Sequence, residues 1–389
     1  MALDNNDFVG SFADENVEFT TQIVRNVSVG DNYWKAMIFV EDDRYIVDTS
    51  LTDWTNVPGA AGCKARVVTV EDYAQVTNSV LSSWLYDLFC NGYSGDCILV
   101  SCGSKPAEES AEDAYDTIIA NMRGAYNALK AYAYHKTCCI GPNSASAPIN
   151  VKVAVELAKM CALDKNLLSS APYFPFVTSG TTEVGNDALY AGLKTADTDA
   201  FMSFSPSPDR NGALFSLGLA MTYLNGSGTV VGTSMDMIKS NMMSSSGLDV
   251  SAKEAFSAAN IQYFKPIGDN TGCVAAVGAT TIKGDVVQAN WIISYVTYMT
   301  KVQVAKLITE PNMLKNGNTY ASIINIMANN LSLFGESGSQ RLKNINITAP
   351  AYNVLPEAKG DEYIIPDAWN AQYVDQVRKV KITGSLYIG

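Results

Sequence analysis

The sequence has very few of the residues on which familiar catalytic and metal sites depend. Among its 389 residues there is a single histidine, His135, and a Ser-His-Asp or Cys-His site would have to use it. A lone histidine at the end of a predicted helix is more often structural or solvated. The histidine count excludes a His-based metal site, and no C-x-x-C pair provides the spacing of a four-cysteine zinc site. We therefore predict no catalytic residue and no metal site.

Nucleotide-binding and nucleophile motifs are also missing. The chain contains no G-x-x-x-x-G-K-[ST], no G-x-S-x-G, and no G-x-G-x-x-G after its early strands. The segment 180–186 follows a predicted strand and could cradle an anion, although a plain loop is the simpler interpretation. We expect no cofactor, and an α/β enzyme with an unrecognised site stays open as an alternative.

Positive charge is scarce. Lys and Arg total 27 against 39 Asp and Glu, and the net charge of −12 argues against nucleic acid and anionic membranes as partners. Charged residues make up only 17% of the chain and apolar ones 47%, so either the core is large or neighbours cover much of the surface. The eight cysteines lie mostly in apolar runs, which favours buried free thiols and folding in a reducing cytoplasm.

Long apolar runs are absent as well. The segment most similar to a membrane span in length and apolar composition is 286–300, and it is interrupted by Gln288, Asn290 and Ser294. The first residues, 1–7, have neither the basic start nor the apolar run of a signal peptide. We therefore expect no membrane insertion.

What the sequence does contain is an alternation of strand and helix between residues 65 and 225. Strands predicted at 66–70, 97–102 and 137–141 alternate with helices whose apolar residues recur every three or four positions. The first helix follows a Thr69 cap and continues to Leu88, and the second starts near Pro106. The pattern predicts an α/β fold with a mostly parallel sheet and helices on both faces.

The C-terminal half follows a Gly-, Ser- and Met-rich stretch at 226–248 that indicates a loop or linker. Beyond it, the apolar spacing predicts helices at 252–259, 287–305, 320–334 and 339–343, with extended segments at 345–354 and 362–365. The predicted organisation is a leader and arm at 1–30, an α/β domain at 31–230, a second domain at 231–368 and a terminal arm at 369–389.

Both ends of the chain have the composition of extended strands. In the closing segment, four apolar side chains alternate with polar ones: Val380, Ile382, Leu386 and Ile388. The segment 17–27 is rich in β-formers, among them Val17, Phe19, Ile23 and Val24. A strand at a chain end either inserts into the sheet of its own domain or pairs with another molecule. We predict pairing with neighbouring subunits, and pairing within the chain stays open.

Several segments resemble contractile tail sheath proteins of phages. They are 261–284, the aromatic helix 287–307 with Trp291, the loop and small-residue helix 209–218, and the tail segment 360–366 followed by 377–378 and the closing strand. The resemblance covers roughly residues 200–389 and rests on the order and pattern of these segments. The first half of the chain shares the α/β order of the family but none of its recognisable sequence motifs.

The resemblance implies a structural subunit and no enzyme. Sheath proteins stack as hexameric rings around a tail tube, their terminal arms add strands to a sheet shared between neighbours, and contraction drives the tube through a cell envelope without nucleotide hydrolysis. The implied partners are further copies of the chain, the tail tube protein, and baseplate and tail terminator proteins. The implied location is the virion tail, assembled in the bacterial host cytoplasm.

The same resemblance implies a helix that holds the tube. The segment 339–343 is the candidate, because Arg341 and Lys343 supply local positive charge in an acidic chain. Two alternatives stay open beside the sheath subunit. One is the α/β enzyme, and the other is another component of the tail, such as a tube or baseplate protein.

Overall fold

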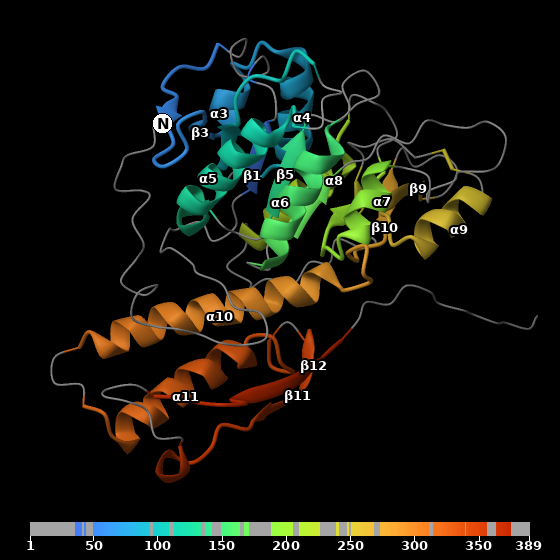
Figure 1. The fold of residues 1–389 in the computed structure, drawn as a ribbon. Helices are drawn as coiled ribbons and strands as arrows, with labels where there is room; N and C mark the ends of the chain where they lie inside the picture. Colours follow the sequence, from blue (N-terminus) through green and yellow to red (C-terminus); the bar gives the residue numbers. More distant parts are fainter. Residues whose placement is uncertain are drawn as a thin grey trace, which may run out of the picture.

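The computed structural model describes most of the chain from Ala36 onward, as an α/β unit with a smaller C-terminal unit beside it (Figure 1). The described residues are 36–40, 43, 50–93, 96–108, 113–133, 137–141, 149–163, 167–170, 188–204, 210–225, 239–240, 247–248, 250–267, 273–310, 314–338, 340–355 and 363–374.

The α/β unit is built on a seven-stranded sheet with the order β2-β3-β4-β1-β5-β6-β7. The strands are β1 Ala36–Val40, β2 Thr55–Asn56, β3 Lys64–Val68, β4 Cys97–Ser101, β5 Thr137–Gly141, β6 Leu167–Ser170 and β7 Phe201–Met202. Neighbouring strands run parallel from β4 through β7 and antiparallel at the β2–β3–β4 edge. The α/β class predicted from the alternation of strands and helices is therefore confirmed.

Helices cover both faces of this sheet (Figure 1). The five residues of β1 are all fully buried because successive side chains enter opposite cores. Ile38 packs in the same cluster as Leu85, whereas Phe39 packs in the other cluster with Met122. The first face carries α4 Ser79–Phe89 and α8 Gly212–Asn225, and the second carries α5 Asp116–Ala133, α6 Val151–Leu163 and α7 Ala188–Thr195.

The first helix of the unit is interrupted, so the prediction of one continuous helix after Thr69 was wrong. Thr69 does cap a helix, but that helix, α3 Val70–Tyr73, ends after one turn. Asn78 then caps α4 separately, because its side-chain oxygen accepts a hydrogen bond from the Leu81 amide at 3.0 Å. The second predicted helix also starts later, since α5 begins at Asp116 and Pro106 is not helical.

A second, three-stranded sheet packs beside β7. It consists of β8 Lys239–Ser240, β9 Tyr263–Pro266 and β10 Val274–Val277, and α9 Val250–Ala258 precedes β9. Gln262 links this sheet to the strand β7 through its backbone. Its backbone N–H donates to the Met202 carbonyl, and its carbonyl accepts a hydrogen bond from the Phe204 N–H. Phe256 and Ile282 belong to the same buried cluster as the second face of the main sheet. The buried cluster on the second face of the main sheet therefore extends to Ile282.

The C-terminal unit begins with the long helix α10 Val287–Ile308, followed by α11 Gly317–Ser332, so the helices predicted at 287–305 and 320–334 are confirmed. Figure 1 shows α10 between the α/β unit and the rest of the C-terminal unit. Accordingly, Val287 and Val296 of α10 share one core cluster with Phe264 on one side and Leu331 on the other. Among the described residues, no helix combines the length and the apolar character that crossing a bilayer requires.

The prediction of a helix at 339–343 was wrong, because this segment leads into a strand. Gln340 has a left-handed backbone with φ of 56°, which a continuing helix does not allow, and β11 Leu342–Ile347 starts two residues later. β11 pairs with β12 Trp369–Tyr373 as an antiparallel two-stranded ribbon, and a short 3₁₀ turn, Tyr352–Val354, lies between them in sequence. The predicted extended segment 345–354 is thus a strand end, a loop and this turn.

Candidate assembly interface

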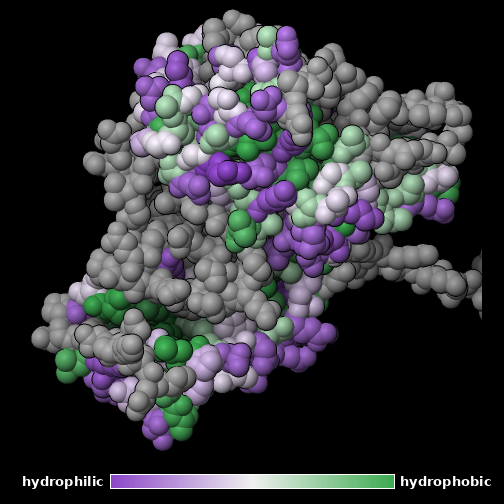
Figure 2. Space-filling view, viewed as in Figure 1, coloured by the Kyte–Doolittle hydropathy of each residue, from purple (hydrophilic) through white to green (hydrophobic). Residues whose placement is uncertain are grey.

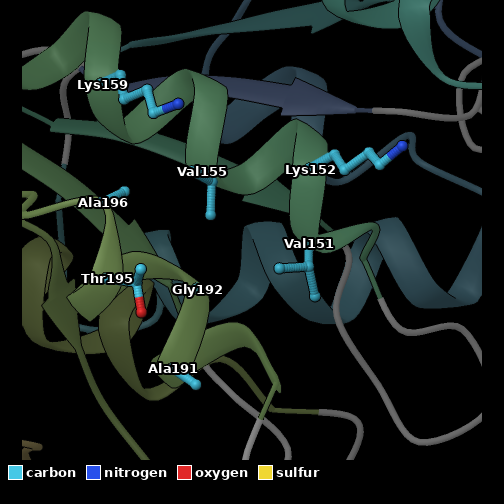
Figure 3. Close-up of a pocket in the computed structure, with 8 residues that line it drawn as sticks. All are labelled: Val151, Lys152, Val155, Lys159, Ala191, Gly192, Thr195 and Ala196. Carbon is cyan, nitrogen blue, oxygen red and sulfur yellow. The ribbon is translucent and has the colours of Figure 1, made fainter. Parts of the chain in front are cut away.

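An open groove of about 550 Å³ lies between α6 and α7 (Figure 3). Lys152 and Lys159 extend from α6, while Val151 and Val155 of the same helix point toward α7 (Figure 3). The other lining residues are Ala191, Gly192, Thr195 and Ala196. This lining contains no carboxylate, thiol or imidazole, so the groove provides no acid–base pair. Nor do the described residues bring three potential metal ligands of the His, Cys, Asp or Glu type together.

The one deeply buried carboxylate of the described core, Asp87 on α4, has a structural task. Its two oxygens accept hydrogen bonds from Arg210, at 2.6 Å, and from the Asn211 amide, at 2.5 Å. Burial raises the pKa of Asp87 to about 6, although the adjacent Arg210 guanidinium opposes that rise. Arg210 also lies over the ring of Tyr86. These contacts fasten the start of α8 to α4.

No local sequence pattern indicates this anchor, because Asp87 and Arg210 are 123 positions apart. Asn211 also caps α8, since its side chain accepts from the Leu214 amide at 3.0 Å. The α4–α8 anchor therefore depends on a contact that only the folded chain creates.

The β11–β12 ribbon presents two different faces. Leu342 is buried, and four half-buried side chains pack with it on the α10–α11 core: Ile345, Ile347, Trp369 and Tyr373. Tyr373 also donates a hydrogen bond from its hydroxyl to Gln288 of α10 at 2.7 Å. The opposite face is polar and exposed, with Lys343, Asn346, Asn370 and Gln372. One face thus anchors the ribbon to the unit, and the other faces outward.

The ribbon has two edges that no described strand covers. In the described part of the chain, β11 and β12 each pair only with the other. An isolated pair of strands is at best marginally stable, and an open edge is a template for an additional strand. Pairing continues just past β12, because the Val374 amide donates to the Arg341 carbonyl at 2.8 Å. The described chain ends at this point, immediately beside the ribbon.

The predicted interface residues divide between the ribbon and segments outside it. Arg341 directly precedes β11 and is half-buried, and Lys343 is exposed on the polar face opposite Gln372. The two charges therefore come together on the ribbon instead of on a helix. The eight predicted arm residues lie outside the described part of the chain: Val17, Phe19, Ile23, Val24, Val380, Ile382, Leu386 and Ile388. The first five residues assigned to the C-terminal arm, 369–373, form β12 of the body.

A second exposed feature lies at the far end of the C-terminal unit. Three tyrosine rings, Tyr320, Tyr352 and Tyr363, pack against one another with centroids 5.9 to 6.3 Å apart. Around them, apolar side chains reach the surface: Leu314 is 67% exposed and Val354 63% exposed. Figure 2 shows hydrophobic surface on this unit. Exposed apolar surface of this kind is typical of contacts between proteins.

The fold is similar to that of a chain in a solved structure, the cryo-EM structure of the anti-feeding prophage (AFP) baseplate, six-fold symmetrised. The two chains share 12% sequence identity and have a TM-score of 0.57, over 96% of this chain and 98% of the other. The sequence matches no protein-family model and no curated protein. Because the likeness extends over nearly the full length of both chains, it concerns the α/β unit and the C-terminal unit together.

Proposed function

We propose that this chain is a structural subunit of a contractile tail or injection particle, and within it the subunit of the sheath. The observation that carries the proposal is the β11–β12 ribbon, whose two edges are covered by no strand of the described residues and which directly precedes the closing segment. The fold likeness to a baseplate chain of such a particle supports the broader part of the proposal. The resemblance of residues 200–389 to sheath proteins supports the narrower part.

In this proposal the closing strand of one subunit adds to the ribbon of another. Four residues separate Val374 from the strand at 379–389, and the five Cα-to-Cα steps across them span about 17 Å when the chain is extended. Each backbone hydrogen bond gained contributes about 1 kcal/mol net. Burial of each apolar side chain of the strand, such as Ile382 or Leu386, contributes about 1.5–3 kcal/mol before the entropy cost. The N-terminal strand at 17–27 supplies a second such link.

Links of this kind allow rigid bodies to move while the polymer stays connected. The α/β unit and α10 share a continuous core, so they would move as one body, and the terminal strands would act as tethers. A modest free-energy gain per subunit then sums over the stacked hexameric rings when the sheath shortens around its tube. The partners of the subunit are further copies, the tube protein, and the baseplate and terminator proteins of the virion tail.

Electron microscopy of the purified protein tests this function. We expect striated tubes or stacked six-fold rings that occur in an extended and a shortened form. A second candidate function is a baseplate component, which the name of the similar structure favours. That function predicts rings that do not stack into tubes of variable length. A homogeneous monomer at high concentration would contradict both functions and leave the enzyme alternative.

Positive charge on the ribbon provides a test of tube contact. The double change Arg341→Glu and Lys343→Glu is expected to lower tube-dependent assembly at least tenfold, because it reverses the local charge that would meet an acidic tube surface. The measurement is the yield of sheath on purified tubes, counted by microscopy. Lys64→Glu, at an exposed position of β3 in the α/β unit, is the matched control. Unchanged assembly of the double variant would refute the ribbon as the tube contact.

A further inference from the structure

Two cysteines face each other where β3 and β4 come together at the antiparallel edge of the main sheet. The observed register ends with Lys64 opposite Ser101, and continuing it by one position places Cys63 opposite Cys102. Both are unbridged, and each is only 1% exposed. Both also belong to the buried cluster on the α5 face, so their side chains project from the same side of the sheet.

The backbone hydrogen bonds indicate whether Cys63 and Cys102 occupy a hydrogen-bonded or a non-hydrogen-bonded position of the antiparallel ladder. The Cys63 amide donates to Ala60, its carbonyl accepts from Val57 at 3.1 Å, and the Cys102 amide donates to Val40 at 3.1 Å. These groups turn away from the partner strand, as they do at non-hydrogen-bonded positions of an antiparallel ladder. Facing Cα atoms at such positions are about 4.5 Å apart. A disulfide requires a Cα separation of about 4.4–6.8 Å, so a bridge needs no movement of the strands.

Helix α5 holds this end of the two strands in place. The Cys63 thiol donates to the Asn121 carbonyl at 3.2 Å, and the Asn121 side-chain amide donates to the Cys102 carbonyl at 3.0 Å. Gly62 and Gly103 flank the two cysteines, and a Cβ at Gly62 would lie only 2.1 Å from the Asn121 amide nitrogen. One residue of α5 thus contacts both cysteines and keeps their strands in register.

We propose that Cys63 and Cys102 form a latent disulfide site. The two thiols are reduced in the cytoplasm, and a peroxide oxidises them to a disulfide once the protein leaves it. Peroxide first converts one thiol into a sulfenic acid and releases water. The second thiol then attacks that sulfur and releases a second water. Overall, two S–H bonds and one O–O bond break, one S–S bond and two O–H bonds form, and two electrons pass from the sulfurs to the peroxide. The move out of the cytoplasm rests on the function proposed above, whereas the bridging of the two thiols can be tested on the purified protein whatever its function.

The bridge would close a loop of about forty residues that contains α3, α4 and β4, and it would hold β3 to β4 in the folded state. Such a bond stabilises mainly by restricting the unfolded chain. Cross-strand bridges carry strain and are reduced more easily than relaxed ones. The site would therefore stiffen the antiparallel edge of the sheet outside the cell and release it in a reducing compartment.

The experiment uses the full-length reduced protein, treated with hydrogen peroxide and then with an alkylating reagent. We expect a non-reducing peptide map to show one linked pair, containing Cys63 and Cys102, lighter than the separate peptides by two hydrogens. The apparent melting temperature should rise by several degrees and return after treatment with dithiothreitol. Cys63→Ser and Cys102→Ser should each abolish both changes, whereas Cys161→Ser, a buried cysteine of the same cluster, should preserve them.

Two results would overturn the proposal. One is peroxide treatment that leaves either thiol as a stable sulfinic acid, or links it to another cysteine, in protein that stays folded. The other is the absence of a linked pair after an incubation in which hydrogen exchange of the β3 and β4 amides shows that the strand ends have opened. The exchange data thus distinguish two cysteines that peroxide has not reached from two cysteines that it has reached without forming a bridge. The incubation continues until the β3 and β4 amides have exchanged completely.

Discussion

Deleting residues 379–389 is expected to abolish polymers of this protein while leaving a folded body. The deletion removes Val380, Ile382, Leu386 and Ile388, which in our proposal complete the ribbon of a neighbouring subunit. The buried clusters of the body are already extensive among the described residues, so we expect its secondary structure to persist without the deleted strand. Sedimentation and electron microscopy measure the polymers, and circular dichroism measures the fold.

Point variants separate the strand pairing from the deletion itself. Ile382→Asn with Leu386→Asn removes two apolar side chains that our proposal buries against the neighbouring ribbon, or about 4 kcal/mol, and should raise the concentration needed for polymerisation about a thousandfold. Lys381→Gln with Thr383→Ser changes neighbouring polar positions and should leave that concentration within about threefold. A deletion product that is globally unfolded would show that the strand completes a sheet of its own chain, and the subunit link would then be wrong.

Gly218→Ala is expected to be among the most destabilising changes in the α/β unit. Alanine normally stabilises a helix by about 0.5–1 kcal/mol relative to glycine. At Gly218 of α8, however, a Cβ would lie 2.0 Å from the backbone oxygen of Leu88 in α4. The two helices would have to separate, which would disturb the buried contacts of Asp87 as well. We therefore expect a loss of about 3 kcal/mol in the free energy of unfolding, measured by urea titration.

The control for this variant is a helical glycine with room for a methyl group. At Gly317 in α11, a Cβ would meet the Tyr352 ring at 3.5 Å, an ordinary van der Waals contact. Gly317→Ala should change the free energy of unfolding by less than about 0.5 kcal/mol. If Gly218→Ala were as stable as the Gly317→Ala control, α4 and α8 would not be packed backbone to backbone, and the anchor through Asp87 would need another explanation.

Local patterns in the sequence were sufficient for much of the fold. The strand–helix alternation predicted the α/β class, and the apolar spacing predicted α10 and α11 close to their observed ends. These features depend on neighbours within a few positions, which the sequence states directly. The absence of nucleotide and metal motifs and the alternating closing strand are likewise properties of the sequence alone. Together they directed the functional proposal toward an assembling subunit.

One missed feature was local, because the break between α3 and α4 comes from a second cap at Asn78, which bonds the Leu81 amide three positions on. The other missed features are those in which distant segments decide a local structure, such as the strand at Leu342, which is stabilised by pairing with β12. The Asp87–Arg210 contact and the facing Cys63 and Cys102 likewise depend on helix packing and strand register. By itself the sequence determined most of the helical and extended segments, with β11 and the break between α3 and α4 as exceptions. Only the tertiary structure decided which of them meet, because burial and pairing free energies are gained between segments far apart in the chain.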